Sequence, residues 1–395
     1  MSTRARAALA VVVALLAVRL LAPLLFGGAL LDAAAGRPGL ISTPVIGDMI
    51  VEALGDRLRT PAGTDSQTTR VTIAPGSSTA DIAGQLYDAG LIADEFAFIV
   101  AVRHAGLEGL LQAGDFLLAP SMTPGEVAQA LIEPYREPTI AFDIRAGLRM
   151  EQIVAKIDTV DLPFSGSEVL QIFRDPPAEL LADYPWLDIP EGGTLEGRLA
   201  AGTYSVPVSA TAEDFVRLLL DGFAAQVPEA LRTASASGLS FAEVLSLASV
   251  VEKEAALDEE RARVAGVFAY RMQRGMGLES DVTLIYMLDS AALRKRDVST
   301  WGGYAFWTIP SGLYARADAP SVPRDLQRWN SRKYRGVPPA PICTPSRASI
   351  EAALNPDTSR RELYFIAIPN GGGKTDFSTT YAEHMRKVRM YGFNP

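Results

Sequence analysis

Residues 245–254 read LSLASVVEKE, a run of apolar and small residues that ends in two carboxylates. Ser240, with Glu243 three residues later, forms a capping box, which predicts the start of a long helix that runs to about residue 274. Burial beside apolar neighbours disfavours the ionised form of a carboxyl group and raises its pKa. A glutamate at the end of this run is therefore a candidate general acid at neutral pH.

Glu252 and Glu254 cannot act together on one bond. Residues two apart on a helix project ~160° from each other, so at most one of them faces a cleft. Glu252 falls on the apolar stripe and Glu254 at its far edge, and periodicity alone does not choose between them. Glycosidases commonly use two carboxylates. A single glutamate suffices if the substrate supplies its own nucleophile, because one group can act first as acid and then as base.

The composition of the 395 residues excludes several classes of site. The net charge of −9 argues against a nucleic-acid partner, whose binding depends on cationic contacts to phosphate. One cysteine, Cys343, allows no internal disulfide and no cysteine-cluster zinc site, and two histidines make multi-histidine metal sites and chymotrypsin-like triads unexpected. His384 is interpreted as a surface helix residue.

The N-terminus contains a candidate membrane anchor. Residues 7–31 are almost all apolar and are long enough to span a bilayer, although Arg19 interrupts them. Arg4 and Arg6 precede this stretch, so residues 1–6 are expected to be a cytoplasmic tail and the rest to lie outside the plasma membrane. A cleaved signal peptide ending near residues 33–35 is the alternative. Residues 32–69, rich in proline and polar residues, predict an extracytoplasmic linker.

The remainder predicts an α+β protein, because strands and helices come in mixed order. Residues 70–145 form a first unit and residues 146–395 a second, larger one. Helices are expected at 79–89, 96–104, 123–131, 150–157, 212–226 and 346–354 and from residue 380, and strands at 71–74, 114–118, 139–144 and 363–368. Residues 163–204 are expected to be mostly loop.

Several motifs carry a resemblance to a known family. Residues 247–255 resemble the active-site helix of the endolytic murein transglycosylases, the YceG-like family. Residues 261–286, 330–356 and 363–384 are similar to the family's later motifs, in order and with similar spacing. Residues 70–145 resemble its LysM-like subdomain. Two elements depart from the family pattern: a Pro-Asp pair is missing at 200–204, and Gly-Gly-Lys replaces Gly-Gly-His at 372–374.

The resemblance implies an enzyme, anchored by a single-pass helix in the inner membrane, that acts without a cofactor. Such an enzyme cuts nascent peptidoglycan strands between N-acetylmuramic acid and N-acetylglucosamine, leaves 1,6-anhydro ends, terminates strand growth and works near peptidoglycan synthases. The family's essential glutamate corresponds to Glu254. Substrate-binding candidates are Glu252, Ser280, Asp281, Thr283, Tyr286, Asn330, Tyr334 and Glu383, although turn formation or packing could also explain several of them.

Two other functions remain open. A membrane-tethered scaffold could bind peptidoglycan without cutting it, with structural carboxylates on the helix. A muramidase-type hydrolase could use Glu254 with Asp281 as the second carboxylate.

Overall fold

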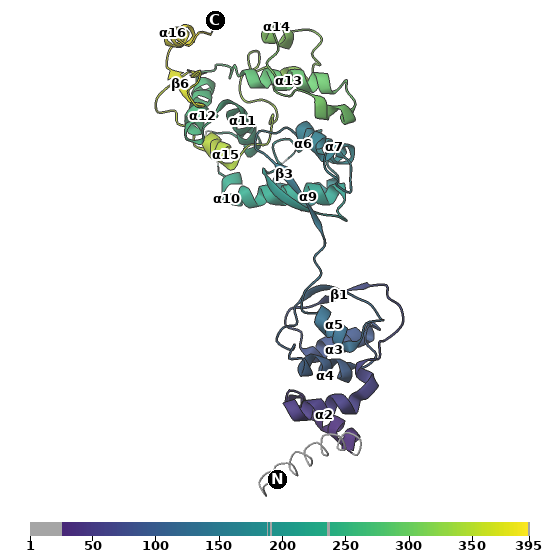
Figure 1. Ribbon diagram of the computed structural model, residues 1–395. Helices are drawn as coiled ribbons and strands as arrows, with labels where there is room; N and C mark the ends of the chain where they lie inside the picture. The colour runs from purple at the N-terminus through teal and green to yellow at the C-terminus, as the bar shows by residue number, and fades with distance from the viewer. Residues whose placement is uncertain (1–25, 188, 190–191, 235–237, 394–395) are drawn as a thin grey trace. The chain divides into compact units, whose positions relative to one another are not determined.

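The computed structural model describes residues 26–187, 189, 192–234 and 238–393, and the chain divides into two compact units, residues 1–137 and 138–395 (Figure 1). Most of the predicted membrane segment, residues 7–25, lies outside the described residues. Residues 26–36 are helical. Within the described ranges, no helix combines the length and the apolarity needed to cross a membrane.

The small unit is built on one antiparallel pair of strands, in which Val71 lies opposite Phe116. Its elements are η1 (Pro38–Leu40), α2 (Pro44–Leu54), η2 (Gly55–Leu58), β1 (Thr69–Ile73), α3 (Thr79–Asp88), α4 (Glu95–His104), β2 (Gly114–Leu118) and α5 (Pro124–Ala130). Helices α3 and α4 connect the strands, and Phe98 and Phe116 are buried in the core between them. The strands and helices predicted between residues 71 and 131 are thus confirmed, including the capping box at Thr123.

Part of the predicted linker is helical. Helix α2 packs against α4, with Ile50 and Leu54 buried beside Val100. These two side chains are spaced i, i+4, which places them on one face of the helix. Residues 44–58 therefore belong to the small unit rather than to an extended segment.

The large unit begins at residue 138, so strand β3 belongs to it and not to the first unit. Its elements up to residue 232 are β3 (Thr139–Ile144), α6 (Met150–Ile157), α7 (Gly166–Arg174), α8 (Ala178–Asp183), η3 (Pro185–Leu187), β4 (Gly202–Pro207), α9 (Ala212–Gln226) and α10 (Glu229–Arg232). Strands β3 and β4 pair antiparallel, and α6, α7 and α9 pack around Phe142. The expectation of mostly loop over 163–204 was wrong, because Ser165 and Glu168 form a capping box that starts α7.

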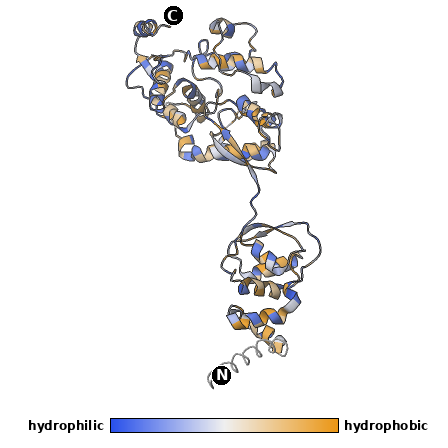
Figure 2. Cartoon of the chain, viewed as in Figure 1, coloured by the Kyte–Doolittle hydropathy of each residue, from blue (hydrophilic) through white to orange (hydrophobic). Residues whose placement is uncertain are grey.

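The rest of the large unit surrounds a buried helix. Its elements are α11 (Phe241–Glu254), α12 (Asp258–Gln273), α13 (Asp281–Leu293), η4 (Val298–Gly303), α14 (Leu313–Ala317), η5 (Leu326–Trp329), α15 (Arg347–Leu354), β5 (Tyr364–Ala367), β6 (Thr375–Ser378) and α16 (Tyr381–Met390). Helix α11 contacts both α12 and α15, and β5 pairs antiparallel with β6 (Figure 1). Figure 2 shows polar and apolar residues on most helices, as expected for helices that bury one face.

The predicted helix over 240–274 is in fact two helices. It begins at the expected capping box but ends at Glu254, where Ala255 adopts an extended conformation. Helix α12 then starts with Asp258, Glu259 and Glu260, whose negative charges are favourable at a helix N-terminus. Glu254 therefore lies at the end of a helix rather than within one. The described residues form an α+β fold with three two-stranded sheets.

Candidate active site

Helix α11 holds Glu254 rigidly because the segment before it is fully packed. Residues 244–251 are all buried. Two serines also tie the helix to the loop at 338–343: Ser246 Oγ donates to the Pro338 carbonyl oxygen at 2.7 Å, and Ser249 Oγ accepts from the Ile342 amide at 2.9 Å. The small residues of the LSLASVV run therefore allow this loop to approach, and the last residue of the helix has a defined position.

Glu254 lines a cavity of about 310 Å³. The other lining residues come from α12, the α12–α13 connection, α13, α14, the 332 loop, β5 and α16: Phe268, Arg271, Leu278, Glu279, Ser280, Asp281, Tyr314, Arg332, Tyr364, Phe365, Tyr381 and His384. The cavity therefore combines a half-buried carboxyl group with charged, hydroxyl and aromatic side chains, which can orient a polar ligand.

The carboxyl group of Glu254 has one hydrogen-bond donor in the described residues. The buried Ser280 Oγ donates to Glu254 Oε1 at 2.6 Å. Burial is the main reason that the pKa of Glu254 is raised to about 7, and the negative charge of Asp281 also raises it. The hydrogen bond from Ser280 and the positive charge of Arg271 lower the pKa. The negative end of the α11 dipole also disfavours the anion at this position. Near neutral pH the group can therefore both give and take a proton.

Asp281 places a second carboxylate in the same cavity, at the first position of α13. Burial raises its pKa, whereas the hydrogen bond from the Tyr314 hydroxyl, at 3.4 Å, and the charge of Arg332 lower it. The residue before Ser280, Glu279, has a φ of 53°. This left-handed conformation is uncommon for a non-glycine residue and turns the chain at the cavity wall.

Arg271 is the buried cation of the cavity. Its Nε donates to the Leu363 carbonyl at 2.6 Å and its Nη1 to the Leu278 carbonyl at 2.5 Å, and Nη1 lies 3.5 Å from Glu279 Oε2. Its guanidinium group lies over the Tyr364 ring, 5.2 Å from the centroid. The Nε and Nη1 groups of Arg271 are therefore used away from Glu254.

An aromatic wall faces Arg271. The ring of His384 stacks on Tyr364 with centroids 5.2 Å apart, and Tyr381 lies 5.8 Å from Tyr364 on the same wall. Burial lowers the pKa of His384, and the charges of Arg271 and Lys387 add to this effect. Its buried Nδ1 has no hydrogen-bond partner in the described part of the chain. A neutral imidazole has one nitrogen that donates and one that accepts a hydrogen bond.

Thr283 supports Ser280 from behind the cavity. It is fully buried, and its Oγ1 donates to the Ser280 carbonyl at 2.8 Å and lies 2.8 Å from Ser331 Oγ. Ser331 Oγ also accepts the Ser280 amide at 3.0 Å. These bonds fix the position of the hydroxyl group that contacts Glu254.

Glu252 does not line the cavity. Its carboxylate pairs with Arg261 at 3.1 Å and accepts hydrogen bonds from the Ser346 amide and from the hydroxyl groups of Ser346 and Ser349, at the start of α15. It therefore links α11, α12 and α15. The periodicity of the apolar residues places Glu252 on the core stripe, and its contacts are those of a buried structural partner.

The remaining candidates lie outside the cavity lining. Tyr286 is buried with the Arg149 guanidinium 4.2 Å from its ring centroid. The Asn330 amide donates to Asp318 at 3.1 Å, and Tyr334 is exposed. Glu383 accepts the Thr379 amide at 3.1 Å and pairs with Lys387, while its neighbour His384 lines the cavity.

Several lining residues were not predicted from the sequence, and His384, which was expected on the surface of a helix, lines the cavity. The missed charged and hydroxyl residues are Arg271, Glu279, Tyr314, Arg332, Tyr364 and Tyr381. They come from segments up to about a hundred residues apart in the chain, and no local pattern marks them. No group of three or more metal-binding side chains occurs among the described residues.

The chain is similar to known proteins both in sequence and in structure. The sequence model of the YceG-like family matches residues 71–390. The endolytic murein transglycosylase of Streptococcus pneumoniae serotype 2 is 27% identical over 336 residues, which cover 80% of this chain but 57% of that protein. The Bacillus subtilis strain 168 protein of the same name is 27% identical over 350 residues, covering 85% of this chain and 89% of the relative. A crystal structure of a yceG-like protein from Listeria monocytogenes has a TM-score of 0.51 and 26% identity, covering 82% of this chain and all of that one.

Proposed function

The chain belongs to the YceG-like family, and we propose that it is an endolytic peptidoglycan transglycosylase with Glu254 as its catalytic residue. The proposed reaction cuts a glycan strand between N-acetylmuramic acid and N-acetylglucosamine and leaves a 1,6-anhydro end. One observation carries the proposal: a carboxyl group with a pKa of about 7 lies in a cavity that also holds hydroxyl and aromatic side chains. The names of the relatives add support.

Glu254 acts first as an acid. In its protonated form it gives its proton to the glycosidic oxygen as the bond from that oxygen to C1 of the muramyl residue breaks, and the next sugar leaves as an alcohol. Because Ser280 donates to Oε1, the transferable proton is expected on Oε2, which is free to face the substrate. Arg271, Tyr364 and Tyr381, which line the same cavity, are proposed to contact the sugars of the bound strand.

Glu254 acts next as a base. Its carboxylate takes the proton of the muramyl C6 hydroxyl group, and the C6 oxygen forms the new bond to C1. The proton returns to Glu254, so no water is consumed and the enzyme ends in its starting state. A pKa near the working pH suits both steps, because each form of the group is then readily populated.

A muramidase-type hydrolase is the second candidate, since Asp281 lies in the same cavity. A carboxylate there could activate a water molecule, and the product would then carry a hydroxyl group instead of the anhydro bridge. A non-catalytic scaffold, the third candidate, would leave the glycan intact.

The wider proposal concerns location and partners. Residues 7–31 would anchor the chain in the plasma membrane as a single-pass helix, with residues 1–6 inside and residues 32–395 outside. The order β1, α3, α4, β2 supports a LysM-like role of the small unit in binding glycan. Cutting nascent strands would terminate their elongation, so peptidoglycan synthases are the proposed partners.

The products of one digestion separate the three functions. The full-length chain in detergent is incubated with purified uncrosslinked glycan, and the products are weighed by mass spectrometry. Anhydro ends support the transglycosylase, products heavier by one water support the hydrolase, and intact polymer supports the scaffold. The Glu254→Gln chain should be folded and inactive. Glu259→Gln, which changes an exposed glutamate at the start of α12, should stay active.

A further inference from the structure

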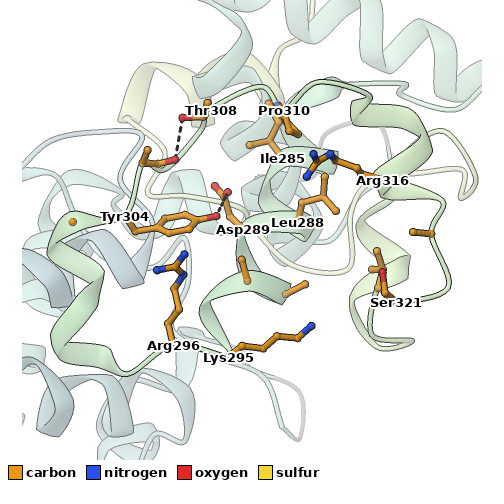
Figure 3. A pocket seen from close by; sticks show the side chains of 16 residues that line it. Ile285, Leu288, Asp289, Lys295, Arg296, Tyr304, Thr308, Pro310, Arg316 and Ser321 are labelled. Carbon is orange, nitrogen blue, oxygen red and sulfur yellow. Dashed lines mark hydrogen bonds between the residues drawn. The ribbon is translucent and has the colours of Figure 1, made fainter.

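A second and larger cavity, of about 610 Å³, lies at the other end of α13. We call it the basic cavity, because Lys295, Arg296 and Arg316 line it (Figure 3). Its wall is apolar: Ile285 and Val322 are buried there, and Leu288, Ala291 and Ala292 also line it. Basic groups beside an apolar wall fit a ligand that is both anionic and partly apolar.

The three cations are available to a ligand. All are exposed, and none forms a salt bridge within the described residues. Their neighbour Arg294, in contrast, pairs with Asp325. Arg296 lies over the Tyr304 ring, 5.3 Å from the centroid, and Arg316 uses its Nε on the Ser311 carbonyl, which leaves its terminal nitrogens free.

Asp289, the one carboxylate that lines the basic cavity, does not neutralise the three cations. Asp289 is buried and accepts from the Tyr304 hydroxyl at 2.8 Å (Figure 3). It also accepts from the Trp307 amide at 3.1 Å. It also lies 3.7 Å from the buried Arg149. In a chain with a net charge of −9, this cavity is therefore a local positive region that attracts anions.

Helix α13 links the basic cavity to the Glu254 cavity. Asp281, at its start, lines the Glu254 cavity, and Lys295 lies just past its end. At 1.5 Å per residue the two are about 20 Å apart along the helix. Helix α14 also serves both, since Tyr314 lines the Glu254 cavity and Arg316 the basic cavity.

We infer that the basic cavity binds the stem peptide that hangs from the muramyl residue at Glu254. The inference rests on the proposed function. Stem peptides combine alanine methyl groups with free carboxylates, which match the apolar wall and the three cations. An extended peptide of five residues spans about 17 Å. The length of the peptide, together with that of the lysine and arginine side chains, is enough to connect the cleavage site with the basic cavity.

Calorimetry tests the inference directly on the full-length chain in detergent. The probe is a synthetic stem tetrapeptide, compared with the same peptide after amidation of its carboxylates. The free-acid peptide should bind about tenfold more tightly than the amidated one, as expected for the loss of two or three exposed charge pairs. In the Lys295→Ala, Arg296→Ala double variant, the affinity for the free-acid peptide should fall by the same factor. The affinity for the amidated peptide should not change.

A matched control removes two other exposed cations. Arg324 and Arg328 are exposed and do not line the basic cavity, so their double alanine variant should bind like the unchanged chain. Equal binding of the two peptides, no binding of the free-acid peptide, or full affinity in the Lys295→Ala, Arg296→Ala chain would overturn the inference. Tighter binding of inorganic pyrophosphate than of the peptide, lost in that same variant, would instead assign the site to phosphate.

Cleavage provides a second measurement. The ratio of kcat/KM for strands with peptides to that for strands stripped by an amidase should fall about tenfold in the Lys295→Ala, Arg296→Ala chain. An unchanged ratio would contradict the inference. Because calorimetry needs no cleavage, a chain that binds the peptide but cuts no glycan would refute the proposed function and leave the peptide site standing.

Discussion

Replacing Glu254 by glutamine should abolish cleavage and at the same time make the large unit more stable at alkaline pH. Burial raises the pKa of this group from its ordinary value of 4.5 to about 7. Its ionised form is therefore destabilised in the folded chain relative to the unfolded one. Glutamine has nearly the same shape but no charge, so it avoids this penalty.

The size of the effect follows from the two pKa values. Each pH unit of difference corresponds to about 1.4 kcal/mol, which gives a penalty of about 3 kcal/mol as an upper limit for this half-buried group. The folded chain holds the proton more tightly, so the stability of the wild-type chain is intact below about pH 4.5 and falls as the pH rises to about 7. The gain from glutamine should therefore be 2–3 kcal/mol, approximately, at pH 8 and below about 1 kcal/mol at pH 5.

Urea unfolding followed by tryptophan fluorescence measures this difference. All four tryptophans, Trp186, Trp301, Trp307 and Trp329, lie in the large unit, so the signal reports that unit alone. A difference that is equal at pH 5 and pH 8, or a wild-type chain that is the more stable one at pH 8, would refute the reasoning.

Glu252→Gln is the matched control on the same helix. The Glu252 carboxylate is paired with Arg261 and bonded by the Ser346 amide and two hydroxyl groups, so its charge stabilises the fold. Losing that charge should lower the free energy of unfolding at pH 8 by about 1–3 kcal/mol. The two substitutions, two residues apart, should thus act in opposite directions.

The other predictions concern the pH profile and the packing. Ser280→Ala removes the donor that lowers the pKa of Glu254, so the alkaline limb of kcat/KM should move up by about one pH unit. Glu279→Gln should move the same limb to lower pH, because the charge of Arg271 is then less neutralised and lowers the pKa of Glu254 further. A limb that stays in place would contradict this. Gly266→Ala would put a Cβ 1.9 Å from the Asp357 carbonyl oxygen, and urea unfolding should show a loss of about 1–3 kcal/mol or more.

Local signals account for the parts of the fold that the sequence predicted well. Capping boxes mark the starts of α5 and α11, and alternating apolar residues mark β3. The end of α11 has no such signal: Ala255 is a good helix former, and its extended conformation depends on tertiary packing. Helix α2 was missed because its prolines and polar flanks resemble those of a linker.

The site was predictable only in part. Ser280 and Asp281 were expected to line a cleft, and they do lie in the Glu254 cavity. Pattern alone could not choose between Glu252 and Glu254, because both end the same apolar run. The contacts that separate them come from Ser346, which bonds Glu252, and from Ser280, which bonds Glu254. Long-range contacts of this kind leave no periodic trace in a sequence.

The chemistry proposed for Glu254 depends on how Arg271 is used. A close ion pair between the two would lower the pKa of the carboxyl group and remove its proton at neutral pH. Instead, Arg271 donates to two backbone carbonyls and lies 3.5 Å from Glu279. Its positive charge is thus partly neutralised by Glu279, while burial and Asp281 continue to raise the pKa of Glu254. We therefore expect Glu279 to favour the protonated acid through Arg271, and its φ of 53° turns the chain where its carboxylate meets that guanidinium group.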